Sequence, residues 1–475
     1  MPPKNIYENQ PAFSPPPVVQ VPVSQTSPPT SVAPAVLSPK KRFPKVFIFI
    51  GIGVILAALV FLAIKFFTGS KNTASGQVTW WGLWEEPSIV TPLITSYEST
   101  HPGVKVSYIK QSQQDYRERL TNALAKGTGP DIFSFHNSWV PMFRGDLDSL
   151  PAAVMNPADF AKTFYPTVSS DLSNGNSIVG IPLGYDALTL FYNEDIFAKA
   201  GKTPPATWDD LRVLARELTI KDDQGVITQA GIALGRTENV DHWPEILALL
   251  MLQNNVDLSS PVGKNAEGAL TFFTNFSLVD GVWDATLPPS TQAFAAGKLA
   301  MYIAPSWRYF EIKSSSPDLK FKTAIIPQVP KDNPSQPDIT YATYWAQGVS
   351  AKSSNKTAAW DFLKFLSTQE SMQKMFQSAA TTRGFGQIYP RTDMAQLLSD
   401  HPILGPIVSQ APGAQSWFLA SRTFDGATGI NSQLANYFGD AINMVANGKG
   451  SATQALTTCA QGIAQVLSQY RLVVK

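Results

Sequence analysis

Side chains suited to binding a sugar follow two segments of this sequence that predict strands. After the predicted strands at residues 77–81 and 131–135 come Trp84, Glu85, Glu86, Asn137 and Trp139. In open α/β sheets, ligands bind at the carboxyl ends of the strands. A pyranose has apolar C–H faces that stack on aromatic rings, and hydroxyls that need both donors and acceptors. This mixture of rings, carboxylates and amides therefore predicts a carbohydrate site.

Later loops offer more side chains of the same chemistry. Trp243 opens a predicted helix, Tyr344 and Trp345 precede a predicted strand, Arg383 lies in a Thr-Arg-Gly-Phe-Gly loop, and Trp417 lies in a loop. Arginine suits hydroxyls because it holds several donors in one plane. The tryptophans have a packing alternative, since large aromatic side chains also fill cores, whereas Arg383 could form an ion pair within the protein instead of touching a ligand. Five tryptophans are assigned to packing: Trp80, Trp81, Trp208, Trp283 and Trp360.

Catalysis is not predicted. Glu85 and Glu86 are adjacent in one loop, whereas glycosidases place two carboxyl groups about 5–9.5 Å apart on either side of the scissile bond. The sequence has no nucleophile elbow, P-loop or His-Glu-x-x-His motif. Its four histidines are scattered without the spacing of zinc ligands. We expect a binding protein with no metal and no cofactor.

Composition narrows the class of protein further. The chain has 475 residues, enough for two compact units, and a net charge of +1. This balance argues against a nucleic-acid partner, which needs a concentrated basic surface. Cys459 is the single cysteine, so no disulfide framework forms within the chain, and we expect this thiol to be a small buried apolar group.

The N-terminal segment differs from the rest of the chain. Residues 1–45 hold 12 of the 37 prolines and predict a disordered tail. Val46–Ile64 has 19 residues without a charge, about the length of a membrane span. Because four basic residues precede it closely, we expect an anchor over residues 46–67 with the tail in the cytoplasm, and a linker over residues 68–76. A cleaved signal peptide is the alternative.

Strands alternate with helices in the part that follows, which predicts a largely parallel α/β sheet with helices on both faces. Gly180–Leu218 is the most informative stretch. Leu188–Tyr192 predicts a buried strand, Asn193 an N-cap, and Gly201 the end of a short helix. Thr207 then begins a second capped helix.

This stretch, GIPLGYDALTLFYNEDIFAKAGKTPPATWDDL, resembles the bacterial extracellular solute-binding proteins of the sugar-binding family 1. The segments GTGPDIFSFHNSW, TQAFAAGKLAMYIAPSW, WAQGVSAKSSNKTAAWDFLKFLSTQES and NGKGSATQALTTCAQGIAQVL are similar to the same family. The resemblance covers essentially residues 77–475. Members usually carry a lipoprotein or cleaved signal, so the predicted anchor departs from the family.

The resemblance implies a two-lobed, periplasmic-binding-protein-like α/β fold of type II. Its N-terminal lobe would comprise residues 77–183 and 304–366, and its C-terminal lobe residues 187–302 and 367–475. Ligand would bind between lobes that close about a hinge. Tyr185 and Asp186 would lie at the first crossing between the lobes, and Trp307 and Arg308 after the return crossing.

The function that follows is an extracellular or periplasmic sugar receptor of an ABC importer, held at the membrane and partnered by permease subunits. Two alternatives stay open. One is a receptor of the same fold for a polyamine or a phosphodiester. The other is a surface module that binds carbohydrate for adhesion or sensing.

Overall fold

Two five-stranded sheets form the framework of the protein. The computed structural model describes residues 76–331 and 335–472. The first sheet contains β1 (Gly76–Gly82), β2 (Val104–Lys110), β3 (Ile132–His136), β6 (Ile181–Pro182) and β12 (Trp345–Val349). The second contains β7 (Leu188–Asn193), β8 (Ile220–Lys221), β9 (Ile227–Ile232), β10 (Leu299–Pro305) and β11 (Phe321–Ala324). A small hairpin pairs β4 (Ser173–Asn174) with β5 (Ser177–Ile178).

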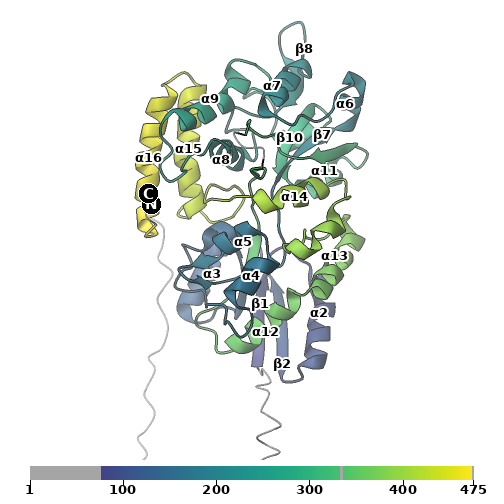
Figure 1. The fold of residues 1–475 in the computed structure, drawn as a ribbon, viewed down its shortest axis with the longest axis vertical. Helices are drawn as coiled ribbons and strands as arrows, with labels where there is room; N and C mark the ends of the chain where they lie inside the picture. Colours follow the sequence, from purple (N-terminus) through teal and green to yellow (C-terminus); the bar gives the residue numbers. More distant parts are fainter. Residues whose placement is uncertain (1–75, 332–334, 473–475) are drawn as a thin grey trace, which may run out of the picture. The chain divides into compact units, whose positions relative to one another are not determined.

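Figure 1 shows the two sheets in separate halves of the described chain, with β1 and β2 below and β7 and β10 above. We call the part built on the first sheet the first lobe and the part built on the second sheet the second lobe. The sheet orders are β2-β1-β3-β12-β6 and β11-β7-β10-β9-β8. Consecutive strands along the chain are therefore often not neighbours in a sheet.

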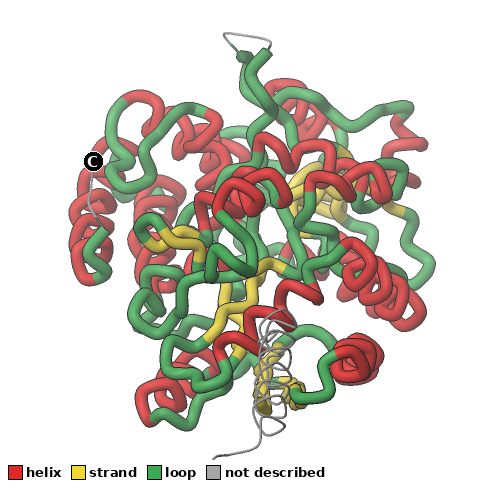
Figure 2. The backbone as a smooth tube through the Cα atoms, turned by 60° about the horizontal axis from the view of Figure 1, so that its bottom comes forward, coloured by secondary structure: helices red, strands yellow, loops and turns green. Residues whose placement is uncertain are grey.

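Helices lie mostly outside the strands (Figure 2). The first lobe holds α2 (Pro87–Thr100), α3 (Tyr116–Lys126), α4 (Pro157–Thr163), α5 (Pro166–Asp171), α12 (Lys356–Leu366) and α13 (Gln369–Arg383). The second lobe holds α6 (Glu194–Ala200), α7 (Trp208–Glu217), α8 (Trp243–Gln253), α9 (Lys264–Leu278), α10 (Ser290–Ala295), α11 (Arg308–Ser315), α15 (Ile430–Ala446) and α16 (Ala452–Gln469). The remaining helices are α14 (Gly405–Gln410), which packs on β7, and the 3-10 helices η1 (Asn137–Trp139), η2 (Thr392–Leu398) and η3 (Ala411–Gly413).

The strand and the two capped helices predicted for the Gly180–Leu218 stretch are confirmed as β7, α6 and α7. Asn193 caps α6, because its side-chain oxygen accepts from the N–H groups of Asp195 and Ile196. Gly201 ends this helix in the left-handed conformation, with φ at 64°. The Thr207 hydroxyl likewise accepts from the third residue of α7. These contacts are local in sequence, which is why the residue types alone predicted them.

The prediction of a largely parallel sheet was wrong, because five of the eight strand pairs in the two five-stranded sheets are antiparallel. In the first sheet β1 is parallel to β2 and β3, but β12 is antiparallel to β3 and β6. In the second sheet β7 is antiparallel to both of its neighbours, and β9 and β10 are parallel. The direction of β12 depends on how the chain returns to the first sheet from the second lobe. The local sequence of the strand does not indicate this direction.

The predicted lobe boundaries also need correction. The return to the first lobe was expected at Ala304, but β11 still pairs with β7 in the second sheet. The chain therefore returns between Ala324 and Trp345. Residues after 366 were expected in the C-terminal lobe, whereas α13 packs against α2 of the first lobe. Strand pairing and helix packing decide these boundaries, and both act over long distances in sequence.

The cores are aromatic and apolar, and Trp139, Trp283 and Trp360 are among their largest buried side chains. Cys459 is a buried free thiol, as predicted. No helix among the described residues is long and apolar enough to cross a membrane. The predicted tail (1–45), the anchor (46–67) and all but the last residue of the linker (68–75) lie outside the described residues.

Candidate functional site

A cavity of about 420 Å³ is lined by residues of both lobes. This volume lies in the range of about 300–1,000 Å³ that small-molecule sites usually have. The wall includes eight of the fourteen side chains that the sequence suggested, and these are Trp84, Glu85, Tyr185, Asp186, Trp307, Tyr344, Trp345 and Arg383.

Three of the other six are buried beside the cavity instead of lining it. Trp139 is fully buried, and its indole N–H donates to the side-chain oxygen of Asn431 at 3.1 Å. The Asn137 amide donates to Asp171 at 3.0 Å. Both residues sit on η1, which turns into the core directly after β3. Arg308 is also fully buried, in a polar cluster behind the wall.

The last three lie farther from the cavity. Glu86 is exposed and pairs with Lys110. Trp243 lines a second cavity of about 270 Å³ instead. Trp417 packs against Phe438, with ring centroids 6.2 Å apart. Proximity to a strand end or a loop was therefore not enough to place these side chains on the wall.

Tryptophan rings form one part of the wall. Trp345, at the start of β12, contacts Trp84 edge to face at a centroid distance of 5.4 Å. It also contacts the buried Trp139 at 5.2 Å. The ring centroid of Phe424, from the second lobe, lies 6.3 Å from that of Trp84. These contacts fix the ring orientations, so the wall offers rigid apolar surface before any ligand arrives.

Asp186 joins the first crossing segment to the turn between β10 and α11 and to the segment that returns to the first lobe. Its carboxylate accepts from the backbone N–H groups of Ala187, Ser306 and Trp307, and from the Ser306 hydroxyl. Its carbonyl accepts from the Thr343 N–H at 2.9 Å. Burial raises the pKa of Asp186 to about 6, although these hydrogen bonds oppose the shift. The carboxylate is thus saturated by hydrogen bonds within the protein.

Glu85 has one oxygen held by the protein and one without a hydrogen-bond partner. Arg383 and Gln387 donate to Oε1 at 2.8 and 3.0 Å. Oε2 is buried and unpartnered. Arg383 thus holds Glu85 in place and also lines the cavity; its predicted contact with a ligand stays a prediction.

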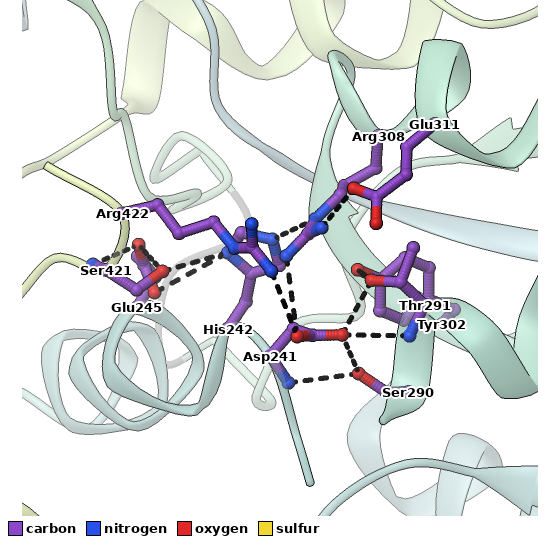
Figure 3. Close-up of polar contacts among 10 residues, drawn as sticks. All are labelled: Asp241, His242, Glu245, Ser290, Thr291, Tyr302, Arg308, Glu311, Ser421 and Arg422. Atoms are coloured by element: carbon purple, nitrogen blue, oxygen red, sulfur yellow. Dashed lines mark hydrogen bonds and ion pairs between the residues drawn. The ribbon is translucent and has the colours of Figure 1, made fainter. Parts of the chain in front are cut away.

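A polar cluster (Figure 3) borders the cavity, whose lining includes its members His242, Glu245, Glu311, Ser421 and Arg422. At its centre the buried Arg308 donates from Nε to His242 Nε2 at 2.9 Å. Arg308 also pairs with Glu311, and its Nη2 lies 3.6 Å from Asp241. The guanidinium carbon lies 4.5 Å from the centre of the Trp307 ring. This stacking places Arg308 on one face of a tryptophan that lines the cavity.

Asp241 anchors the cluster to α10. The Thr291 hydroxyl and N–H donate to its carboxylate at 2.6 and 2.9 Å, and the Ser290 hydroxyl donates at 3.1 Å. Burial alone would raise the pKa of Asp241, but these hydrogen bonds and the charge of Arg308 outweigh it and lower the pKa to about 2. Arg422 approaches the same carboxylate at 3.5 Å. Asp241 is therefore ionised throughout the physiological range.

The cluster fixes the direction of a hydrogen-bond chain that ends at the cavity. Since an arginine Nε can only donate, His242 Nε2 must accept, and the proton of the neutral ring lies on Nδ1. Burial lowers the pKa of His242, which keeps the ring neutral. Nδ1 lies 3.2 Å from the Ser421 hydroxyl, which donates to Glu245 Oε1 at 2.8 Å. The chain therefore runs from Arg308 through His242 and Ser421 to Glu245.

This direction also bears on catalysis. Ser421, His242 and a carboxylate lie as close together as the members of a hydrolase triad do. In a triad, however, the imidazole accepts the serine proton, whereas His242 presents an N–H to Ser421. The arrangement does not activate Ser421 as a nucleophile. Among the described residues, no group of His, Cys, Asp and Glu side chains could hold a metal ion.

Four buried polar atoms on the wall have no hydrogen-bond partner. They are the indole nitrogen of Trp84, Oε2 of Glu85, the hydroxyl of Tyr185 and Oε2 of Glu245. Buried polar groups are normally paired, and leaving one unpaired is unfavourable. The set contains a donor, two acceptors and a hydroxyl that can do either. Together they match a ligand that carries several hydroxyl-like groups.

Several wall residues escaped the sequence analysis. The most important are Trp80, His136, His242, Glu245, Gln347, Arg422 and Phe424. Trp80 was assigned to packing; it is indeed buried and donates to Gln347 at 2.9 Å, but it also borders the cavity. Of these residues, only Glu245 could have been suggested by the sequence, because it lies in the first turn of the helix that begins at the candidate residue Trp243. Arg422 and Phe424 adopt positive φ, of 53° and 57°, which their residue types do not reveal.

Known proteins share both the sequence pattern and the fold. The family profile described as "Bacterial extracellular solute-binding protein" matches residues 73–373. A binding protein of Brucella abortus is 24% identical over 298 residues, which are 60% of this chain and 69% of that protein.

Two solved structures are similar to the described fold. The sugar-binding protein MalE of Xanthomonas citri has a TM-score of 0.68 and 19% identity, covering 83% of this chain and 98% of its own. An ABC transporter solute-binding protein of Thermotoga lettingae, bound to α-D-tagatose, has a TM-score of 0.63 and 21% identity, covering 83% and 100%. At these identities, the structures establish a two-lobed α/β solute-binding protein fold.

Proposed function

This chain belongs to the bacterial extracellular solute-binding proteins, and from that membership we propose that it binds a sugar or an oligosaccharide in the cavity between its lobes. The observation that carries the proposal is the set of four unpartnered polar atoms beside the rings of Trp84 and Trp345. Rings suit the C–H faces of a pyranose, and the unpartnered atoms suit its hydroxyls. The Xanthomonas and Thermotoga proteins, which are a sugar-binding protein and a tagatose complex, support the same ligand class.

A melting experiment tests the ligand class. The full-length chain, in mild detergent, would be heated alone and with a panel of mono-, di- and oligosaccharides. A sugar at a hundredfold excess over its Kd stabilises a protein by about 2.7 kcal/mol, which raises the melting temperature of a chain this size by about 3 °C. The Trp243→Ala variant serves as a control, because that ring lies outside the cavity and the shift should persist. No shift with any sugar would refute the proposal.

The unpaired carboxylate oxygens of Glu85 and Glu245 favour one alternative ligand, a polyamine, over a phosphodiester. Ammonium groups bind carboxylates, whereas a phosphodiester anion would be repelled by them. Spermidine and glycerophosphocholine therefore belong in the same melting panel. A shift with spermidine and none with sugars would favour the polyamine receptor.

We also propose that the protein serves an ABC importer from the outer face of the membrane, anchored by Val46–Ile64. The support is the uncharged 19-residue run, with basic residues mostly before it. The full-length polypeptide should then fractionate with membranes, and externally added protease should digest residues 76–475 in intact cells. A soluble protein that begins near Ser75 would refute the anchor. Loss of sugar uptake on deletion would separate transport from adhesion or sensing.

A further inference from the structure

Glu245 has one satisfied oxygen and one unsatisfied oxygen. It lies in the first turn of α8, lines the cavity, and its side chain is 1% exposed. Oε1 accepts from the N–H of Ser421 at 2.6 Å and from the Ser421 hydroxyl at 2.8 Å. Oε2 is buried and has no hydrogen-bond partner. Ser421 therefore holds one oxygen of a residue that lines the cavity, and the other oxygen has no hydrogen-bond partner among the described residues.

Among the described residues, no lysine or arginine forms an ion pair with Glu245. Its ionic neighbour is His242, whose Nδ1 lies 3.8 Å from Oε2. That ring is neutral, because its Nε2 accepts from Arg308. Arg308 and Arg422 are both turned toward Asp241, at 3.6 and 3.5 Å. A buried carboxylate without a cation is strongly unfavourable, so its retention calls for a partner from outside the chain.

The other charges around the cavity are already accounted for. Arg383 pairs with Glu85 at 2.8 Å. Glu311 pairs with Arg308. Asp186 accepts from four donors, on Ala187, Ser306 and Trp307. After this pairing, Glu245 is left with an oxygen that has no hydrogen-bond partner and without an arginine or lysine ion pair among the described residues.

We propose that the ligand is a carbohydrate that carries a protonated amine, and that this amine binds Oε2 of Glu245. The inference rests on the proposed function, because the sugar ring would occupy the remainder of the cavity. A hydroxyl would fill the vacant hydrogen bond, but only a cation also compensates the charge. The Trp84 N–H and the Tyr185 hydroxyl are then left for ring hydroxyls of the same ligand.

Matched pairs of sugars test this inference. Binding to the full-length chain would be measured by calorimetry at about pH 6.5, where a sugar amine is protonated. The pairs are glucosamine with glucose, galactosamine with galactose, and mannosamine with mannose, each with its N-acetyl form as an uncharged amide. In at least one pair the amine should bind about tenfold more tightly than both uncharged forms.

The Glu245→Gln variant removes the charge and keeps the size and the acceptor for Ser421. Its preference for the amine should fall below about twofold. The ligand-free variant should melt no lower than the original protein, because an uncompensated buried charge has been removed. Glu86→Gln is the matched control, since it makes the same change at an exposed carboxylate outside the cavity and should keep the preference.

The outcomes separate the inference from the proposed function. Equal or tighter binding of the uncharged sugars would overturn the inference and leave the sugar receptor standing. An amine preference that persists in Glu245→Gln would also overturn it. Binding of spermidine without any sugar would overturn both the sugar receptor and the amine-bearing carbohydrate. Failure of every carbohydrate to bind would do the same.

Discussion

Replacing Arg308 with methionine should destabilise the protein by about 3–5 kcal/mol at neutral pH, the cost of breaking a buried ion pair by removing one partner. The side chain is fully buried. It donates to His242 at 2.9 Å, pairs with Glu311, and lies 3.6 Å from Asp241. Methionine fills much of the same volume, so the loss reports the charge and its hydrogen bonds more than the packing.

The pH dependence of this loss is also determined by the structure. The pKa of Asp241 is about 2 in the folded protein, below its usual 3.8. An aspartate with a lowered pKa stabilises the fold above its unfolded pKa, and the contribution is lost as the pH falls through the folded pKa. For Asp241 that contribution is about 2 kcal/mol. Without Arg308 the pKa should rise, so the variant should lose less stability than the original protein between about pH 4 and pH 2.

Urea unfolding at several pH values measures both effects. Arg216→Met is a matched control, because Arg216 also lies 3.6 Å from an aspartate, Asp280, but is 51% exposed. Such a pair contributes about 1 kcal/mol or less. A loss in Arg308→Met no larger than in Arg216→Met would refute the account of the buried cluster. An unchanged acid limb of the stability profile would refute the role given to Arg308 in holding Asp241 ionised.

Two further changes probe the cavity wall and Asp186. Trp84→Phe keeps an aromatic ring but removes the unpartnered N–H. The Kd for the bound sugar should therefore rise about threefold to tenfold, while the melting temperature stays close to that of the original protein. An unchanged Kd in calorimetry would argue against a ligand contact at this N–H. Burial raises the pKa of Asp186 to about 6, so the folded state gains a proton before the unfolded chain does, and this group should add up to about 3 kcal/mol of stability as the pH falls from 7 to 4. Asp186→Asn should remove that component, and identical pH profiles of unfolding for the two proteins would contradict it.

Local elements could be predicted from the sequence because their causes lie within a few residues. The caps of α6 and α7 and the strand β7 follow from Asn193, Thr207 and an apolar run. Asn137 and Trp139 show the limit of that reasoning. They follow a strand, as expected of ligand contacts, yet η1 turns them into the core toward partners more than thirty residues away.

The polar half of the site could not be predicted for the same reason. Arg308 was expected to contact the ligand. Instead it interacts with Asp241 and His242, which lie 67 and 66 residues earlier in the chain. Glu245 is recognised as a candidate ligand contact only from the tertiary structure, in which Ser421 donates to one of its oxygens and the other has no hydrogen-bond partner. Residue type identified the chemistry available here. The tertiary contacts decide which groups remain open to a ligand.

The place of β12 in the first sheet has a consequence for biosynthesis. This strand lies between β3 and β6, yet every strand of the second sheet precedes it in the chain. On the ribosome, all strands of the second sheet emerge while the first sheet still lacks a central member. The first sheet, whose strands begin to be made first, is thus completed after the second sheet. Trp345, carried by β12, reaches the cavity wall only at that step, so a nascent chain that ends before it has no complete ligand site.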